Sequence, residues 1–276
     1  MKSPSEREAI IAGDIELFSA RLSLRAWSWK NIDPWQRKLL QSQDRYIHCN
    51  CSRQSGKSST LAIKAFHKML VKEGALILII AEQRQSNEDI RKVKELAETY
   101  DKIIREKYDN QITLRMMSDN ITSVEFDNRS RCISLPANEK IRGYSAPDIV
   151  WIDEAHYVDD KVFQSVEPMI EVSPEGQLIM SSTPNAEKGR EGFFYFESGN
   201  PRYVHFKIPW DQCPRISEES IKEKRMIYGE AYVQTEYECQ FQEGGAALFT
   251  EQALKDSFDE TEDVFSNTMK TIADML

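Results

Sequence analysis

The sequence lacks paired cysteine motifs, long apolar runs and internal repeats. Its few cysteines include no C-x-x-C pair, so we expect a reduced protein of the cytosol without disulfides or structural zinc. The longest apolar run, 75–81, is far too short to cross a bilayer, and the first residues are polar. The sequence therefore predicts neither a disulfide-stapled domain nor a membrane protein. The five cysteines are Cys49, Cys51, Cys132, Cys213 and Cys239.

The sequence has fewer basic than acidic residues, and its net charge is −9. This balance argues against a surface that coats nucleic acid everywhere, but it says little about one local face. The basic residues that do cluster are interleaved with glutamate or lie at helical spacing, which predicts solvated helix faces. These groups are Lys64/Lys68/Lys72, Arg91/Lys92/Lys94 and Lys222/Lys224/Arg225.

What the chain does contain is a phosphate-binding loop at residues 50–59, Asn-Cys-Ser-Arg-Gln-Ser-Gly-Lys-Ser-Ser, between a strand-like run and a helical one. Backbone N–H groups of such a loop wrap a β-phosphate, Lys57 reaches the β- and γ-oxygens, and the Ser58 hydroxyl completes a Mg²⁺ shell. Cys51 stands where the usual pattern has glycine. The loop predicts binding of a nucleoside triphosphate through Arg53, Gln54, Ser55, Gly56, Lys57, Ser58 and Ser59.

A second motif follows about a hundred residues later, where the apolar run 148–152 ends in Asp153 and Glu154. Two adjacent carboxylates after a buried strand divide the work of hydrolysis. Asp153 is expected to hold Mg²⁺ through its waters, and Glu154 to accept a proton from the attacking water. The pair alone could be a solvated turn, but together with the loop it predicts an Mg²⁺-dependent ATPase.

The periodicity predicts an α/β fold of the P-loop NTPase class, with a mostly parallel central sheet flanked by helices. Short alternating stretches predict an appended antiparallel meander, and a helical lid or linker region follows near the C-terminus. The chain is long enough for one such core plus a small appendage, but not for two nucleotide-binding domains. Expected strands are 46–49, 75–81, 111–116, 121–126, 132–135, 148–153, 177–181 and 203–208; expected helices are 8–15, 17–29, 34–40, 58–71, 86–107 (capped at Ser86), 161–170 and two within 217–240, separated at Gly229.

The ordered set of motifs resembles the ATPase domain of the large terminase subunit of tailed bacteriophages, over residues 30 to 250. The resemblance implies a motor that uses ATP and Mg²⁺ to drive double-stranded DNA into a procapsid. It also implies a ring of identical subunits, a portal protein and a small terminase subunit as partners, and the host cytoplasm as location. The matching pieces are Pro34-Trp35-Gln36, Arg53-Gln54-Ser55-Gly56-Lys57-Ser58, Arg142-Gly143, Val150-Trp151-Ile152-Asp153-Glu154-Ala155, Ser182-Thr183-Pro184-Asn185, Tyr228-Gly229 and 236–241.

The resemblance also implies roles for single residues. Gln36 would read the adenine edge, because an amide both donates and accepts; otherwise it is an ordinary polar helix residue. Arg53 would touch or sense the γ-phosphate, and Arg142 would serve as an arginine finger for a neighbouring subunit, worth about a thousandfold in rate. The alternatives are a solvent-exposed loop charge and a surface arginine in a turn. Ser182 and Thr183 would couple hydrolysis to movement, although Ser-Thr-Pro can also be a simple turn.

The expected domains are an N-terminal helical extension (1–30), the P-loop ATPase core (31–210), a helical lid or linker (211–245) and an acidic tail or linker (246–276). Large terminases continue into a nuclease domain, and we expect none in this chain. The acidic residues near the end are interpreted as a solvated tail. They are Asp256, Asp259, Glu260, Glu262 and Asp263.

Two other functions fit parts of the sequence. Residues 153–156 spell the DEAH box of a helicase, but too few residues follow Thr183 for the second domain that a helicase needs. The chain could instead be a scaffold in which ATP only orders subunits. Glu154 argues against a scaffold, because binding alone does not require the second carboxylate.

Overall fold

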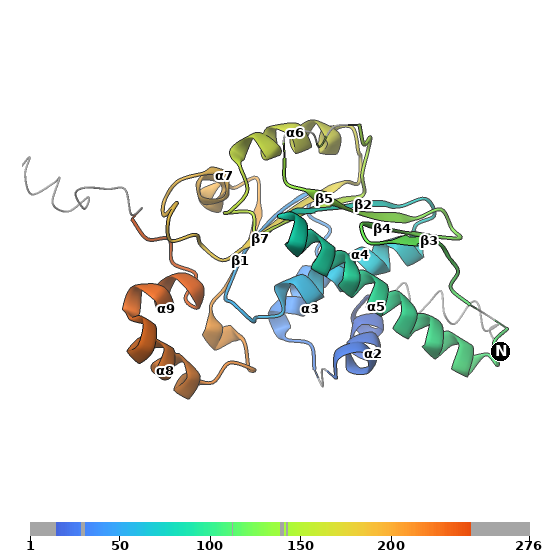
Figure 1. Cartoon of the computed structure of the whole chain (residues 1–276), viewed down its shortest axis with the longest axis horizontal. Coiled ribbons are helices and arrows are strands. Elements are labelled where there is room, and N and C mark those ends of the chain that lie inside the picture. Colours follow the sequence, from blue (N-terminus) through green and yellow to red (C-terminus); the bar gives the residue numbers. More distant parts are fainter. Residues whose placement is uncertain (1–14, 29–30, 112, 139–140, 142, 244–276) are drawn as a thin grey trace, which may run out of the picture.

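A computed structural model describes residues 15–28, 31–111, 113–138, 141 and 143–243. These residues form a central sheet with helices on both faces (Figure 1). The helices are α2 (Ile15–Trp27), α3 (Pro34–Gln41), α4 (Lys57–Val71), α5 (Gln83–Lys107), α6 (Asp160–Glu171), α7 (Phe193–Phe196), α8 (Glu218–Tyr228) and α9 (Glu230–Glu236). The strands are β1 (Tyr46–Cys51), β2 (Leu76–Ala81), β3 (Met116–Asn120), β4 (Ser123–Phe126), β5 (Arg131–Pro136), β6 (Ile149–Asp153), β7 (Gln177–Ser182) and β8 (Val204–Ile208).

The described strands form one sheet in the order β3-β4-β5-β2-β6-β7-β1-β8. From β5 to β8 every neighbouring pair is parallel, whereas β3 and β4 add an antiparallel meander at one edge. The predicted mostly parallel α/β fold with appended antiparallel strands is therefore confirmed. Although β2 follows β1 in the sequence, β6 and β7 lie between them, so the carboxyl ends of β1, β7 and β6 are side by side.

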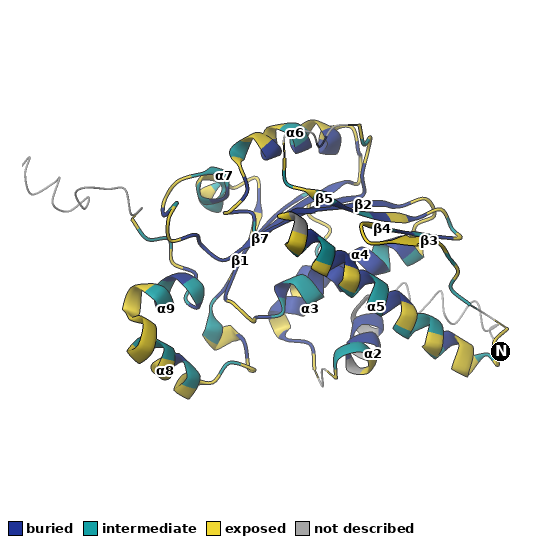
Figure 2. Cartoon of the chain, viewed as in Figure 1, coloured by how far each residue is buried: buried dark blue, intermediate teal, exposed yellow. Residues whose placement is uncertain are grey.

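The parallel strands are apolar on both faces because helices cover both faces. Alternate residues of β1 and β2 pack beneath α2, α3, α4 and α5, and the intervening ones pack against α6 and α7. Figure 2 shows these strands buried along their length. This double cover holds the strand ends rigidly, which is what a site built on those ends requires.

The hydrophobic pattern located most elements, and the errors have local causes. The first meander strand was predicted at 111–116, but β3 begins at Met116 and continues to Asn120, in the gap between two predicted strands. None of its side chains is buried, so hydrophobic periodicity gives little signal for this strand. Helix α5 begins three residues before the predicted cap Ser86, with Glu82 as the N-cap residue.

The interpretation of the basic groups as solvated helix faces was wrong for Lys64, and the side chains of Lys92 and Lys94 are only partly exposed. Lys64 is 4% exposed, and its ammonium donates to the carbonyls of Leu39, Leu40 and Ser42 at the end of α3. This arrangement ties α4 to α3, because carbonyls at a helix end have no partner within the helix. Lys92 belongs to the site described below.

Helices α8 and α9 pack around a small apolar cluster of their own, formed by Ile221, Val233 and Tyr237. They are separated at Gly229, whose φ of 84° suits glycine, as expected from the sequence.

The proposed division into domains stays a prediction, and its segments 1–14 and 244–276 lie outside the described residues. All five cysteines are free and buried. Within the described ranges, no helix has the length and apolarity needed to cross a bilayer.

Candidate nucleotide and hydrolysis site

The phosphate loop connects the end of β1 to the first turn of α4. Gly56 has a φ of 92°, in the left-handed region that favours glycine, and it is the N-cap residue of α4. Because the helix begins at Lys57, its unpaired N–H groups face the loop, as anion binding requires. A cavity of about 260 Å³ lies in the loop. Its lining consists of Ser52, Arg53, Gln54, Ser55, Gly56, Lys57, Ser58, Ser59, Lys92, Glu154 and Thr183.

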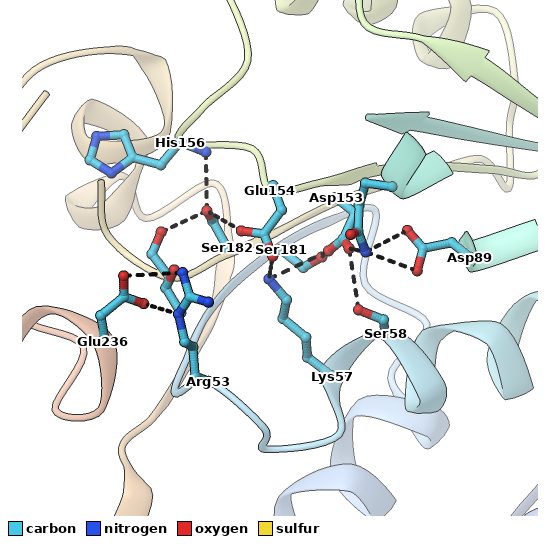
Figure 3. Close-up of polar contacts among 12 residues, drawn as sticks. Arg53, Lys57, Ser58, Asp89, Asp153, Glu154, His156, Ser181, Ser182 and Glu236 are labelled. Carbon is cyan, nitrogen blue, oxygen red and sulfur yellow. Dashed lines mark hydrogen bonds and ion pairs between the residues drawn. The ribbon is translucent and has the colours of Figure 1, made fainter. Parts of the chain in front are cut away.

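Lys57 lies between the two carboxylates of the second motif (Figure 3). Its ammonium is 2.8 Å from Glu154 Oε1 and 3.6 Å from Asp153 Oδ1. Burial lowers the pKa of Lys57, but the two carboxylates outweigh this effect and the net shift is upward. The lysine is therefore a fixed positive charge at the mouth of the loop.

Asp153 is the last residue of β6 and is completely buried. Its Oδ2 accepts a hydrogen bond of 3.2 Å from the Ser58 hydroxyl, and its Oδ1 accepts one from Ser181 on β7. Burial raises the pKa of Asp153, but the charge of Lys57 and the hydrogen bond from Ser181 lower it by more than burial raises it. The net shift of the pKa is therefore downward. An ionised carboxylate beside a hydroxyl is a hard oxygen donor set of the kind that suits Mg²⁺.

Glu154 turns away from Asp153 although the two are adjacent in sequence. Its backbone has a φ of 48°, which is costly for a residue with a side chain and is common at functional sites. The turn leaves the Glu154 side chain 34% exposed and lining the cavity, while Asp153 stays inside the sheet. The two carboxylates therefore have different surroundings, one dry and one open to water.

Arg53 lies at the rim of the cavity and connects the loop to α9. Its guanidinium donates to the Glu236 carboxylate at 2.5 and 3.2 Å, and its backbone N–H donates to the Glu236 carbonyl at 2.8 Å. Arg53 and Glu154 also line an adjoining cavity of about 670 Å³. The loop, the carboxylate strand and α9 thus meet around these two side chains.

Gln36 is fully buried and does not line the loop cavity. Its Oε1 accepts from the Asp33 backbone N–H at 2.9 Å in a capping box at the start of α3, and its Nε2 has no partner. Asp33 binds Arg215, which donates to the Ser55 carbonyl at 2.7 Å. Gln36 is thus connected to the loop through Asp33 and Arg215.

Ser182 ends β7 beside Glu154, as the sequence predicted for the strand next to the carboxylate strand. Its hydroxyl is 3.4 Å from Glu154 Oε2 and donates to the Thr183 carbonyl at 2.6 Å. Thr183 itself lines the loop cavity. The predicted finger Arg142 lies outside the described residues.

The sequence reasoning missed three residues of α5 at the metal side of the site. Gln85 Nε2 donates to Asp153 Oδ2 at 3.1 Å. The buried carboxylate of Asp89 lies 2.9 Å from the Lys92 ammonium, and Lys92 lines the loop cavity. Burial and the carboxylate of Asp153 raise the pKa of Asp89. The sequence does contain a signal for these residues. They lie about one helical turn apart, on one face of a helix that directly follows a central parallel strand, where ligands of such sheets bind.

The fold and this loop define an α/β protein of the P-loop type. Residues 49–256 match the family model described as terminase large subunit, T4likevirus-type, N-terminal. This match covers more than half of the chain, so the chain belongs to that family, and the resemblance inferred from the motifs is confirmed.

Solved structures of large terminases share the fold. The Thermus phage P74-26 large terminase ATPase domain aligns with a TM-score of 0.61 and 21% identity, covering 79% of this chain and 96% of that one. The large terminase of the thermophilic bacteriophage D6E aligns with a TM-score of 0.57 and 12% identity, covering 77% and 53%. The HK97 large terminase gives 0.57 and 15%, covering 76% and 50%. This chain thus spans about half the length of the last two structures, and no curated protein matches its sequence.

Proposed function

We propose that this chain is an Mg²⁺-dependent ATPase that powers translocation of double-stranded viral DNA into a procapsid. The observation that carries the proposal is the convergence of Lys57, Ser58 and Glu154 around one loop cavity, with Asp153 held against Lys57 and Ser58, at the carboxyl ends of β1 and β6. Family membership supports it, as do structures of the D6E large terminase in complex with ADP and with ATP-γ-S.

The roles follow from the surroundings of each group. Lys57 binds the β- and γ-phosphates in exchange for the Glu154 carboxylate. Ser58 and Asp153 hold Mg²⁺, which when bound neutralises charge on the phosphate oxygens. Glu154, the carboxylate open to water, accepts the proton of the attacking water, a contribution of roughly 10²–10⁴-fold.

The remaining roles are proposals of the same kind. Arg53 contacts the γ-phosphate in exchange for Glu236, and Gln36 reads adenine once its amide is released from Asp33. Arg142 acts as a finger in a neighbouring subunit, and Ser182 and Thr183 couple hydrolysis to movement.

We also propose a homo-oligomeric ring in the host cytoplasm that works with a portal protein and a small terminase subunit. The absence of DNA cleavage stays a prediction, tested by a nuclease assay with Mg²⁺ and Mn²⁺.

The first experiment is steady-state ATP hydrolysis over a wide range of protein concentration, with and without duplex DNA. We expect specific activity to rise with concentration, and Glu154→Gln and Arg142→Ala to lose turnover. An unaffected Arg142→Ala variant in a fully active monomer would remove the finger. A wild-type chain that binds ATP but never hydrolyses it, even with DNA at high concentration, would favour the nucleotide-ordered scaffold instead.

A further inference from the structure

His156 follows the carboxylate pair and makes two directed hydrogen bonds with its ring. Its Nδ1 accepts from the Asn185 backbone N–H at 2.7 Å, and its Nε2 lies 2.9 Å from the Glu191 carbonyl oxygen. Since a backbone N–H can only donate and a carbonyl can only accept, Nδ1 is bare and Nε2 carries the proton. Burial lowers the pKa of His156, in agreement with this neutral form.

These two hydrogen bonds hold both ends of a single loop, residues 185–191. Inside the loop, the Asn185 side chain accepts from the Glu187 N–H at 2.8 Å, and the Asn185 carbonyl accepts from the Gly189 N–H at 2.9 Å. The loop begins two residues after Thr183 and ends just before α7. One imidazole therefore holds both ends of the segment that follows Ser182, Thr183 and Pro184.

The same residue also reaches the hydrolytic carboxylate through Ser182. The His156 backbone N–H is 3.3 Å from the Ser182 hydroxyl oxygen, which is 3.4 Å from Glu154 Oε2 (Figure 3). The backbone of His156 therefore contacts Ser182 at the end of β7, while its ring holds loop 185–191, which is joined to Ser182 through Thr183 and Pro184.

The far side of the ring faces aromatic residues that lie beyond the hydrolytic site. The His156 ring centroid is 5.7 Å from that of Phe194 on α7 and 5.3 Å from that of Phe241, and Phe194 and Phe241 are also neighbours. Phe241 lies five residues after Glu236, the partner of Arg53. His156 therefore contacts both Ser182, beside Glu154, and Phe241 in the segment after α9.

We propose that His156 is a positioning residue for the hydrolytic site. Its neutral ring clamps loop 185–191, and this clamp sets Ser182 against Glu154 and links the carboxylate to α7 and Phe241. The inference rests on the proposed ATPase function. It assigns the connection between the hydrolytic site and α7 to the side chain of His156 rather than to Ser182 and Thr183 alone. An ordinary buried histidine would only fill space, so the two views predict different behaviour for substitutions that separate shape from hydrogen bonding.

Two variants make that separation. His156→Phe keeps an aromatic ring of similar size but loses both hydrogen bonds, whereas His156→Gln loses the ring but offers an acceptor and a donor. We expect His156→Phe to lower kcat by on the order of 10- to 100-fold with the KM for ATP little changed, and His156→Gln to restore much of kcat. His205→Phe is the matched control, because His205 is an exposed histidine on β8 that bonds only to the Asn200 carbonyl in the structure.

Hydrogen exchange supplies a readout that does not require turnover. With ATP-γ-S as the probe, we expect loop 185–191 of the wild type to change its exchange rate, and His156→Phe to exchange fast with and without nucleotide. A kcat of His156→Phe equal to wild type would overturn the proposal. So would equal losses in both variants that follow their Tm. If the wild type hydrolyses no ATP but its loop still responds to ATP-γ-S through His156, the proposed function fails while the clamp stands.

Discussion

The Lys57 ammonium lies 2.8 Å from a Glu154 carboxylate oxygen, so the cation of the phosphate loop and the candidate general base form an ion pair. Each group has its proposed role only when it faces the nucleotide instead. A phosphate that reaches Lys57 must therefore compete with Glu154, and the released carboxylate becomes free to face water. Binding of the nucleotide to Lys57 therefore releases Glu154 to act as the general base.

The first prediction concerns nucleotide affinity in Glu154→Gln. Removing the competing charge should strengthen binding of ATP-γ-S by roughly three- to tenfold, since a partly exposed ion pair is worth about 1 kcal/mol after solvent screening. Isothermal titration calorimetry measures the change, with Glu175→Gln at an exposed position as the control. Weaker binding by Glu154→Gln would show that the carboxylate does not compete with the phosphates.

The second prediction concerns Lys92, which the structure adds to the loop cavity. Replacing it by methionine should weaken binding of ATP-γ-S about three- to tenfold, because one charge-assisted contact to a phosphate is lost. Lys94 lies two residues away on α5 but pairs with Asp119, outside the cavity, so Lys94→Met is the matched control. Equal affinities of the two variants in the same titration would contradict a phosphate contact by Lys92.

The third prediction concerns the contact between the loop and α9. Glu236→Ala should increase proteolysis within α8 and α9 and lower stability by about 1 kcal/mol, because the Arg53 guanidinium loses its partner while the backbone hydrogen bond remains. Limited proteolysis and thermal denaturation measure both effects. Glu218→Ala serves as the control, because Glu218 forms an exposed pair within α8. Unchanged cleavage of Glu236→Ala would mean that the side-chain pair does not hold α8 and α9 in place.

The fourth prediction concerns pH. Burial lowers the pKa of His48 to about 4, with a smaller contribution from the nearby His205, and the His48 ring stacks on Phe194. Between pH 6.5 and about 4 the unfolded chain binds a proton at this site and the folded chain does not. Stability is therefore lost as the pH falls through this window, by about 3 kcal/mol at most from this residue.

Chemical denaturation of wild type and His48→Gln at several pH values tests this effect. The variant should have a flatter pH dependence between 6.5 and 4, because glutamine does not titrate. His156, whose pKa burial also lowers, acts in the same direction in both proteins, so the difference between them isolates His48. The exposed His205→Gln variant should keep most of the wild-type slope, because burial, the larger cause of the lowered pKa of His48, remains. An equal slope in His48→Gln would contradict the assignment.

The features that could be predicted before the structure was known are those that depend on residues close together in the chain. Gly56 before Lys57 and Ser58 specifies a turn into a helix, and an apolar run ending in Asp153 and Glu154 specifies a buried strand with two carboxylates at its end. Such signals survive in the sequence because backbone sterics and burial act on each residue locally. The family could therefore be inferred from the order of the motifs alone.

Which side chains share the site could be seen only once the strands and helices were packed together. The insertion of β7 between β1 and β6 places Ser181 and Ser182 beside the carboxylates, and the packing of α5 brings Gln85 and Lys92 to the same point. Packing also buried Gln36 and Lys64, whose residue types predict exposure. The physical reason is that strand order and helix docking depend on contacts between residues far apart in the chain, which no local pattern records.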